Sequence, residues 1–302
     1  MESRTAAPPV SSDKQKAVDG GRLPPSQPAM RQHTVETADG GHLRVFSFGD
    51  GPGVVLVCGT NTVAPTYFRT ARRLSKGLSV HVYDRRGRPG SSLQPEDYSL
   101  HTEVADLGRV MEATGSSMVF GHSYGGAVAL EAGLQPSVRR IAVYDAVPNI
   151  GGAVPTHFLP EFESAVQRGD VHRAVSILGK GISAKLSNSP LPDPVFHAMV
   201  RILAISTRKG RAWKSTVHSA VNELALLDAH RPPAERYAGI SVPVLVLYGS
   251  DSDVFYAVIA QALSAQLLHG RCTAVAGADH GALDRAPGGL ISQLSDFLAD
   301  GS

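Results

Sequence analysis

The 302-residue sequence predicts an α/β protein with a mostly parallel sheet, and three observations carry that prediction. Short apolar, β-branched runs alternate with helical patterns through most of the chain, which indicates parallel strands covered by helices on both faces. The alternation stops between 147 and 239, where only helical patterns occur. A glycine-flanked serine, Ser123, stands where one strand-like run meets a helix-like run.

Eight runs have the length and composition of strands. Asp39-Gly40-Gly41 between the first two is a hairpin signal, so these two are expected to pair directly. The expected strands are 32–36, 42–48, 54–58, 78–83, 117–121, 140–144, 242–248 and 272–276. The helices expected between and after them are 67–74, 100–113, 126–134, 254–268 and 287–298.

The composition changes at two places and divides the chain into three parts. Residues 1–30 are rich in Pro, Ser and Gly and nearly lack large apolar side chains, which predicts a disordered tail. Residues 31–146 and 240–302 are expected to form the α/β core. Residues 147–239 are expected to form an inserted helical cap. Its helical stretches are 159–167, 171–178, 195–207 and 212–227.

The overall charge and hydropathy argue against several classes of partner. A formal net charge of +2 gives no electrostatic case for nucleic acid or for a membrane surface. No apolar stretch approaches the ~20 residues needed to cross a bilayer, and the N-terminus has no signal-like apolar region. We therefore expect a cytoplasmic protein, and its oligomeric state is left open. The two cysteines, Cys58 and Cys272, are expected to be free thiols.

Ser123 and His280 are the residues whose setting suggests chemistry. A serine on a tight strand-to-helix turn is lifted clear of the sheet, with its hydroxyl in a cleft. Such a hydroxyl needs a base within hydrogen-bond reach, and the base needs an orienting carboxylate. His280 follows the last expected strand in the glycine-flanked loop 277–281, which suits it for the role of base.

These motifs resemble those of the α/β-hydrolase superfamily over residues 31–299. The elbow Gly121-His122-Ser123-Tyr124-Gly125, the turn Tyr83-Asp84-Arg85-Arg86-Gly87-Arg88 and the His280 loop carry the resemblance. It implies an eight-stranded, mostly parallel sheet flanked by helices, and a chain order of serine, acid and histidine. The charged turn 84–88 could alternatively bind phosphate, but the resemblance implies that it fixes loop geometry near the site.

The resemblance also implies a place for the triad acid. The acid is expected in the turn after strand 242–248, commonly three residues beyond a glycine. From Gly249 that position is Ser252, which cannot serve. Asp251 is the preferred acid. Asp253 is the first alternative, although it could simply cap the following helix, and Asp145 is the second.

An oxyanion hole needs two backbone N–H donors. The resemblance implies that Tyr124 supplies one, immediately after the nucleophile. The other is expected from the loop after the third strand, at Thr60, with Asn61 as the alternative. Many relatives carry His-Gly where this chain has Cys58-Gly59, but a backbone donor does not depend on that side chain.

The predicted function is that of a serine hydrolase that cleaves a carboxylic ester, a thioester or a lactone of a small molecule through an acyl-enzyme. No metal signature and no dinucleotide-binding motif is present, so no cofactor is expected. Two alternatives stay open. One is a non-hydrolytic enzyme of the same fold, such as an acyltransferase, an eliminating lyase or a cyclase. The other is a catalytically silent ligand-binding protein.

Overall fold

Eight strands form a single sheet in the order β1-β2-β4-β3-β5-β6-β7-β8. The computed structural model describes residues 30–299, without the side chains of Arg208 and Lys209, so the tail predicted for 1–30 lies outside it except for Met30. β2 pairs antiparallel with β1 and β4, and the other neighbours are parallel. The strands are β1 (Arg31–Glu36), β2 (His42–Phe48), β3 (Gly53–Val57), β4 (Ser79–Asp84), β5 (Met118–His122), β6 (Arg140–Tyr144), β7 (Val244–Gly249) and β8 (Gly270–Val275).

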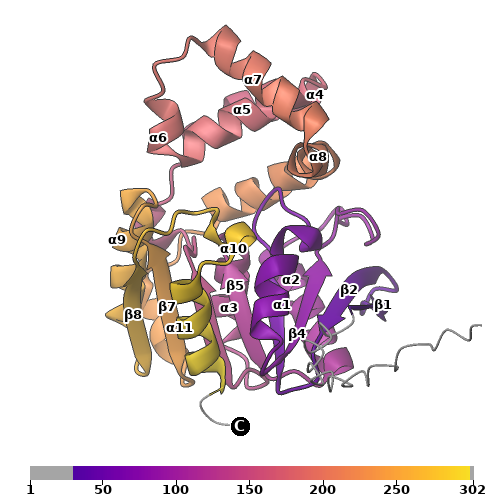
Figure 1. The fold of residues 1–302 in the computed structure, drawn as a ribbon, viewed down its shortest axis with the longest axis vertical. Coiled ribbons are helices and arrows are strands. Elements are labelled where there is room, and N and C mark those ends of the chain that lie inside the picture. The colour runs from indigo at the N-terminus through magenta and orange to yellow at the C-terminus, as the bar shows by residue number, and fades with distance from the viewer. Residues whose placement is uncertain (1–29, 300–302) are drawn as a thin grey trace, which may run out of the picture.

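Helices cover both faces of this sheet (Figure 1). Successive side chains of a strand point to opposite faces, and β3 shows this clearly. Val55 and Val57 join the apolar cluster beneath one set of helices, while Val54 and Leu56 join the cluster beneath the other. The first set is α2 (Leu100–Thr114), α3 (Tyr124–Ala132) and α9 (Val254–Ser264). The second is α1 (Phe68–Leu74), preceded by η1 (Ala64–Tyr67), with α10 (Ala282–Arg285) and α11 (Gly288–Ala299).

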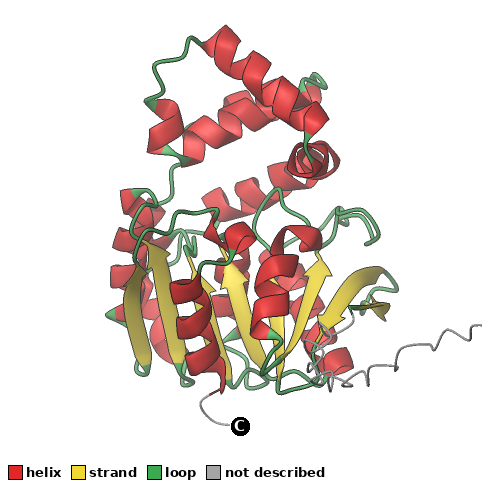
Figure 2. Ribbon diagram, in the orientation of Figure 1, coloured by secondary structure: helices red, strands yellow, loops and turns green. Residues whose placement is uncertain are grey.

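The segment between β6 and β7, called the helical insertion below, lies beyond the carboxyl ends of the central strands (Figure 2). Its apolar side chains, such as Phe158, Phe162 and Phe196, are buried and continue one of the two core clusters. The insertion contains η2 (Ile150–Gly152), α4 (Leu159–Gln167), α5 (Val171–Ile182), α6 (Ala184–Ser187), α7 (Asp193–Ser206), α8 (Arg208–Ala229) and η3 (Ala234–Gly239). No helix within residues 30–299 is both long enough and apolar enough to span a bilayer.

Local sequence signals explain where several helices begin. A serine, threonine or aspartate before a helix can accept a hydrogen bond from a backbone N–H of the first turn. Ser99 does so for α2, as part of a reciprocal capping box with Thr102. Asp170 does so for α5 and Thr207 for α8. The positions of these helices therefore follow from the sequence as well as from packing.

The two cysteines are both free, as the sequence predicts. Cys58 follows β3 and Cys272 lies in β8, and the sheet order separates these strands by four steps. At ~4.8 Å per step they are about 19 Å apart, well beyond the ~7 Å limit for a disulfide. Burial raises the pKa of the Cys58 thiol, so this cysteine is not poised for thiolate chemistry.

His81 in β4 makes the fold sensitive to acid. Burial of its ring, together with repulsion from His33 and Arg31, lowers its pKa to about 4 from 6.5. The unfolded chain therefore binds more protons between these values, and stability must fall as the pH drops from 6.5 to 4. We expect a loss on the order of 2 kcal/mol in the free energy of unfolding.

Urea unfolding of His81→Gln at pH 6.5 and 4.5 tests this expectation. Glutamine can keep the polar contacts with Ser47 and Ser79 but cannot take up a proton, so the variant should lose less stability than the wild type between the two pH values. The exposed histidine of α2, changed in His101→Gln, should leave the wild-type dependence in place. An equal loss in His81→Gln and the wild type would contradict the assignment.

Candidate active site

Ser123 stands on the sharp turn between β5 and α3. Its φ of 54° and ψ of −123° lie in a strained region that recurs at functional sites. The Ser123 N–H donates to the Tyr144 carbonyl at 3.1 Å, and the Ser123 carbonyl accepts from the Gly126 N–H at 2.9 Å. A Cβ at Gly125 would collide with the Val57 carbonyl oxygen, so glycine is required where α3 meets β3. The turn presents Ser123 to a cavity above the sheet.

His280 reaches the same cavity from the loop between β8 and α10. Its ring stacks on the ring of Tyr256, with centroids 4.6 Å apart and an interplanar angle of 16°. On another side it lies 4.6 Å from the ring of His122, the residue before Ser123. The side chain is 29% exposed, so it is held in place yet reachable. The structure thus brings together the two residues that the sequence pairs as nucleophile and base.

Asp145 is the carboxylate that contacts His280. It follows β6 directly, and its Oδ2 lies 3.1 Å from the His280 Nδ1. The same Oδ2 accepts a hydrogen bond of 2.6 Å from the Ser252 hydroxyl, and Oδ1 accepts one of 3.0 Å from the Gly249 N–H. The carboxylate is fully buried, and buried charges require such partners. Asp145 therefore has the contacts expected of the residue that orients a catalytic histidine.

In the structure the carboxylate that contacts His280 is that of Asp145 and not that of Asp251, the residue predicted to orient the histidine. Asp251 is exposed, and its carboxylate accepts from the Ser250 hydroxyl at 3.0 Å. The Asp253 carboxylate is also engaged elsewhere than at His280. Its Oδ1 accepts a hydrogen bond of 2.6 Å from the Ala184 N–H of α6. Asp253 does not cap α9 with its side chain either. The second alternative, Asp145, takes the place in the structure.

The reason lies in the sheet order. β6 and β7 are neighbours, so the residue after β6 and the turn after β7 converge on the same histidine. Ser252 occupies the position at which the family pattern expects the acid, and its hydroxyl binds the carboxylate that comes from the neighbouring strand. Asp145 has a backbone φ of +44°, which is uncommon for residues other than glycine. The sequence feature that pointed to Asp145 was its position directly after an apolar strand.

Of the two predicted oxyanion donors, Tyr124 follows Ser123 directly and Thr60 lines the same cavity as Ser123. Tyr124 is the first residue of α3, and the first N–H groups of a helix have no partner within the helix. Thr60 and Asn61 line the cavity. The Gly59 N–H is already used, since it donates to the Tyr67 hydroxyl at 2.9 Å. In the loop after β3, Thr60 therefore remains the first candidate for the second backbone N–H donor of the oxyanion hole.

A hydrogen-bond chain through Tyr67 and His122 was not predicted from the sequence. The Tyr67 hydroxyl accepts from the Gly59 N–H and lies 2.9 Å from the His122 Nδ1. The His122 Nε2 lies 3.1 Å from the carbonyl oxygen of His280. A carbonyl can only accept, so Nε2 carries the proton and Nδ1 accepts from the tyrosine. This chain fixes the loop of Gly59 relative to the loop of His280.

The cavity above Ser123 has a volume of about 350 Å³, which is in the range of small-molecule sites. Its floor is formed by the core, and its upper wall by α5, α7 and α8 of the helical insertion. Within residues 30–299, no group of three His, Cys, Asp or Glu side chains is placed to hold a metal ion. The polar groups of the cavity are gathered around Ser123, while the insertion contributes mainly apolar side chains.

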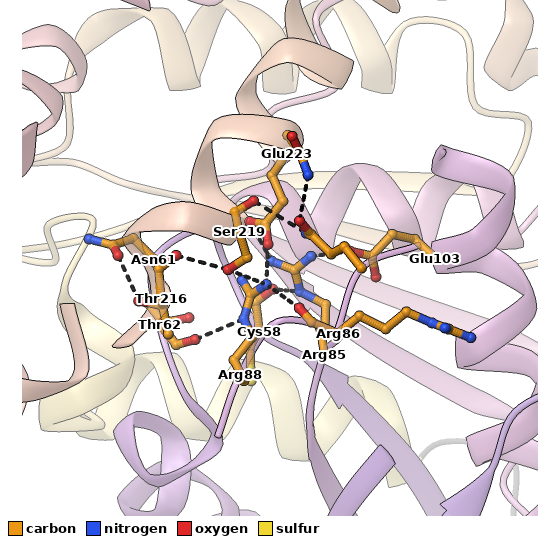
Figure 3. A network of polar contacts seen from close by, with 12 residues as sticks. Cys58, Asn61, Thr62, Arg85, Arg86, Arg88, Glu103, Thr216, Ser219 and Glu223 are labelled. Atoms are coloured by element: carbon orange, nitrogen blue, oxygen red, sulfur yellow. Dashed lines mark hydrogen bonds and ion pairs between the residues drawn. The ribbon is translucent and has the colours of Figure 1, made fainter. Parts of the chain in front are cut away.

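The arginines of the turn after β4 are buried and bind protein groups (Figure 3). Arg85 pairs with Glu103 of α2 and with Glu223 of α8, and Arg88 pairs with the same Glu223. Both guanidinium groups also donate to the Gly59 carbonyl. The turn therefore fixes loop geometry, as the resemblance implies, and offers no free arginine for a phosphate at Arg85 or Arg88.

Electrostatic attraction keeps Glu223 and Arg85 ionised. Burial opposes the charge of Glu223, but the adjacent Arg85 and Arg88 outweigh it and hold the pKa of Glu223 below its ordinary value. Arg85 loses solvation on burial as well, yet Glu103 and Glu223 raise its pKa well above the ordinary range. Fully buried ion pairs of Arg85 and Arg88 with Glu223 thus join the helical insertion to the core.

Comparison with known proteins identifies the family. The model of the alpha/beta hydrolase family matches residues 54–293. Over 132 residues the chain is 32% identical to N-formylmaleamate deformylase of Pseudomonas putida, an alignment that covers 41% of this chain and 48% of that protein. The chain therefore spans about half the length of this curated relative.

Solved structures share the fold over almost the whole chain. An alpha/beta hydrolase from Sphaerobacter thermophilus has a TM-score of 0.74 and 25% identity, covering 88% of this chain and all of the other. The N-formylmaleamic acid deformylase from Pseudomonas putida S16 has a TM-score of 0.64 and 22% identity, covering 87% of this chain and all of the other. Since the family model spans most of the sequence and these hydrolases superpose on its sheet and helices, the chain belongs to the alpha/beta hydrolase family.

Proposed function

We propose that this protein is a serine hydrolase that cleaves a carboxylic ester, a thioester or a lactone of a small molecule. One observation carries the proposal. Ser123 on its strained turn and His280, itself bonded to the buried Asp145, face a single cavity of small-molecule size. Each member has the environment that its role requires: an accessible nucleophile, a reachable base and a buried orienting carboxylate.

The mechanism follows from this arrangement. The Ser123 hydroxyl attacks the substrate carbonyl as the His280 Nε2 takes its proton, and Asp145 on Nδ1 holds the ring in the required tautomer. The N–H groups of Tyr124 and Thr60 stabilise the oxyanion. His280 then gives its proton to the leaving alcohol, and water activated by the same ring releases the acyl group. In this scheme residues 147–239 act as a cap that forms the upper wall of the cavity.

Labelling with a fluorophosphonate probe tests the nucleophile. A serine primed by a histidine reacts rapidly with such a probe, so mass spectrometry should find the adduct on Ser123. Ser123→Ala should abolish the labelling, while the exposed Ser292→Ala should not affect it. Labelling of native protein no faster than of heat-denatured protein would contradict the proposal and favour a ligand-binding protein without turnover.

An isotope experiment distinguishes hydrolysis from acyl transfer, because only hydrolysis places an oxygen atom of water in the acid product. If water releases the acyl group, turnover in ¹⁸O-labelled water must place one labelled oxygen in the acid product. An enzyme that passes the acyl group to another acceptor, or that eliminates, would leave the acid unlabelled or form none. The deformylase named among the relatives also acts on a carbonyl, and its formyl amide is a further substrate to assay.

A further inference from the structure

The cavity divides into a polar end and an apolar body. The polar end surrounds Ser123 and is formed by the loop 59–62, His122, His280 and Asp284. The body lies toward the helical insertion. Its apolar lining includes Leu178, Phe196, Val200, Trp213, Leu224 and Leu227. A substrate whose carbonyl reaches Ser123 and whose remainder fills the body of the cavity is therefore surrounded by hydrocarbon side chains.

The described part of this wall carries no lysine or arginine. Arg85 and Arg88 lie behind the Gly59 carbonyl, where they are fully buried and paired with Glu103 and Glu223. A carboxylate entering the body of the cavity would lose its water without gaining a cation, which is strongly unfavourable.

We infer that this site, acting as the hydrolase proposed above, takes an uncharged ester with an apolar body and rejects substrates that carry a carboxylate in that body. The apolar lining favours aliphatic or aromatic groups through burial, and its described residues offer a buried anion no lysine or arginine. This inference rests on the proposed function for the reaction, but its binding component can be measured separately.

Dimethyl suberate and monomethyl suberate are a matched pair of probes, because they differ by one methyl group and one negative charge. For the wild-type protein at pH 7.5 we expect kcat/KM for the diester to exceed that for the monoester by about 100-fold. Equal values, or a preference for the monoester, would overturn the inference.

Two substitutions on α7 test whether local charge sets this preference. Leu203 lines the cavity and is 39% exposed, so Leu203→Lys can add a cation at the wall without full burial. The neighbouring Ile202 is 65% exposed and does not line the cavity, so Ile202→Lys adds the same charge elsewhere. We expect Leu203→Lys to reduce the diester preference about tenfold and Ile202→Lys to leave it unchanged. Equal effects of the two variants would count against the inference.

Binding can be followed without turnover in Ser123→Ala. The sequence contains one tryptophan, Trp213, and it lines the cavity, so its fluorescence reports occupancy. Dimethyl suberate should change the emission at concentrations at which monomethyl suberate does not. Should the diester bind while the wild type turns over neither ester nor the probe, the proposed function fails and the inference stands. Should Ser123 react with fluorophosphonate while the monoester binds better, the inference alone fails.

A second inference comes from the hydrogen bonds of Ser252. Its hydroxyl donates to Asp145 Oδ2 at 2.6 Å, and this oxygen is also the one facing His280. Ser250, two residues earlier in the same turn, donates to the exposed Asp251 at 3.0 Å. The two serines make the same kind of bond, but only the bond of Ser252 leads to the histidine.

We propose that Ser252 is a positioning residue that holds the Asp145 carboxylate against His280, in support of the hydrolysis proposed above. Hydrogen bonds to a charged group are stronger than those between neutral groups. Loss of the Ser252 hydroxyl would leave Asp145 with the Gly249 N–H on Oδ1 and a less constrained Oδ2. The histidine ring would then spend less time in the orientation that accepts the proton of Ser123.

A double-mutant cycle with Asp145→Asn separates positioning from a merely structural role. Ser252→Ala should lower kcat by about 10- to 100-fold in the wild type, and it should have little further effect on kcat once Asp145 is asparagine. Ser252→Thr, which keeps a hydroxyl, should recover most of the activity. Ser250→Ala is the matched control and should leave kcat unchanged. Full additivity of Ser252→Ala and Asp145→Asn, or a loss that Ser252→Thr fails to recover, would overturn the assignment.

Discussion

Ser123→Ala is expected to lower kcat for an ester substrate by about 10⁶-fold, because the members of a catalytic triad act as a unit. The substitution removes the attacking oxygen and relieves none of the contacts that hold the turn, which are made by the backbone of Ser123. The melting temperature and the far-ultraviolet circular dichroism should therefore stay near the wild-type values. Steady-state kinetics with a chromogenic ester provides the measurement.

His280→Ala is the companion variant for this result. It should produce a loss of similar size, since the serine would keep its hydroxyl but lose the base. A protein in which Ser123→Ala keeps most of the activity would not use a covalent mechanism, and a non-hydrolytic reaction would then become the better explanation. A large loss accompanied by unfolding would show in the melting temperature and would have to be distinguished from the chemical effect.

Asp145→Asn has the second largest expected effect, a decrease in kcat of about 10⁴-fold with a folded protein. An asparagine in this place can offer its N–H₂ group to the histidine and stabilise the wrong tautomer. Asp251→Asn and Asp253→Asn should stay near the wild-type kcat, because neither carboxylate touches His280. Kinetics of the three variants, each with its melting temperature, tests the placement. A catalytic loss confined to Asp251→Asn would restore the sequence-based assignment.

Much of the fold could be predicted because its determinants are local. The eight strands lie within a few residues of the ranges expected from apolar runs, and the turn at Ser123 has the strand-to-helix setting that its glycines indicate. The longer helices of the insertion were also expected. The four-residue helices α6 and α10 were not, because so short a segment carries no periodic pattern.

The triad acid could not be identified from local sequence, because the aspartate that contacts His280 is determined by how separate segments of the chain pack together. Asp145, Asp251 and Asp253 all follow strands whose carboxyl ends lie side by side. In the structure Asp145 faces the histidine, with an unusual backbone φ and a hydrogen bond from the Ser252 hydroxyl of the neighbouring turn. The pairing of Arg85 and Arg88 with Glu223 is equally hidden, since these residues are more than 130 positions apart.

The buried ion pairs of Glu223 determine which part of the insertion can move when substrate enters. Pulling α8 away would leave Arg88 without its carboxylate partner and Arg85 with Glu103 alone, at a cost of about 3–5 kcal/mol for a broken buried pair. At the other end, α6 meets the core through the exposed bond between the Ala184 N–H and Asp253, which water can replace at little cost. We therefore expect α8 to act as a fixed hinge and α6 with α7 as the gate. Such lid motions occur on the microsecond to millisecond scale, and weakening the Asp253 contact is expected to change the rate of product release while the chemical step stays the same.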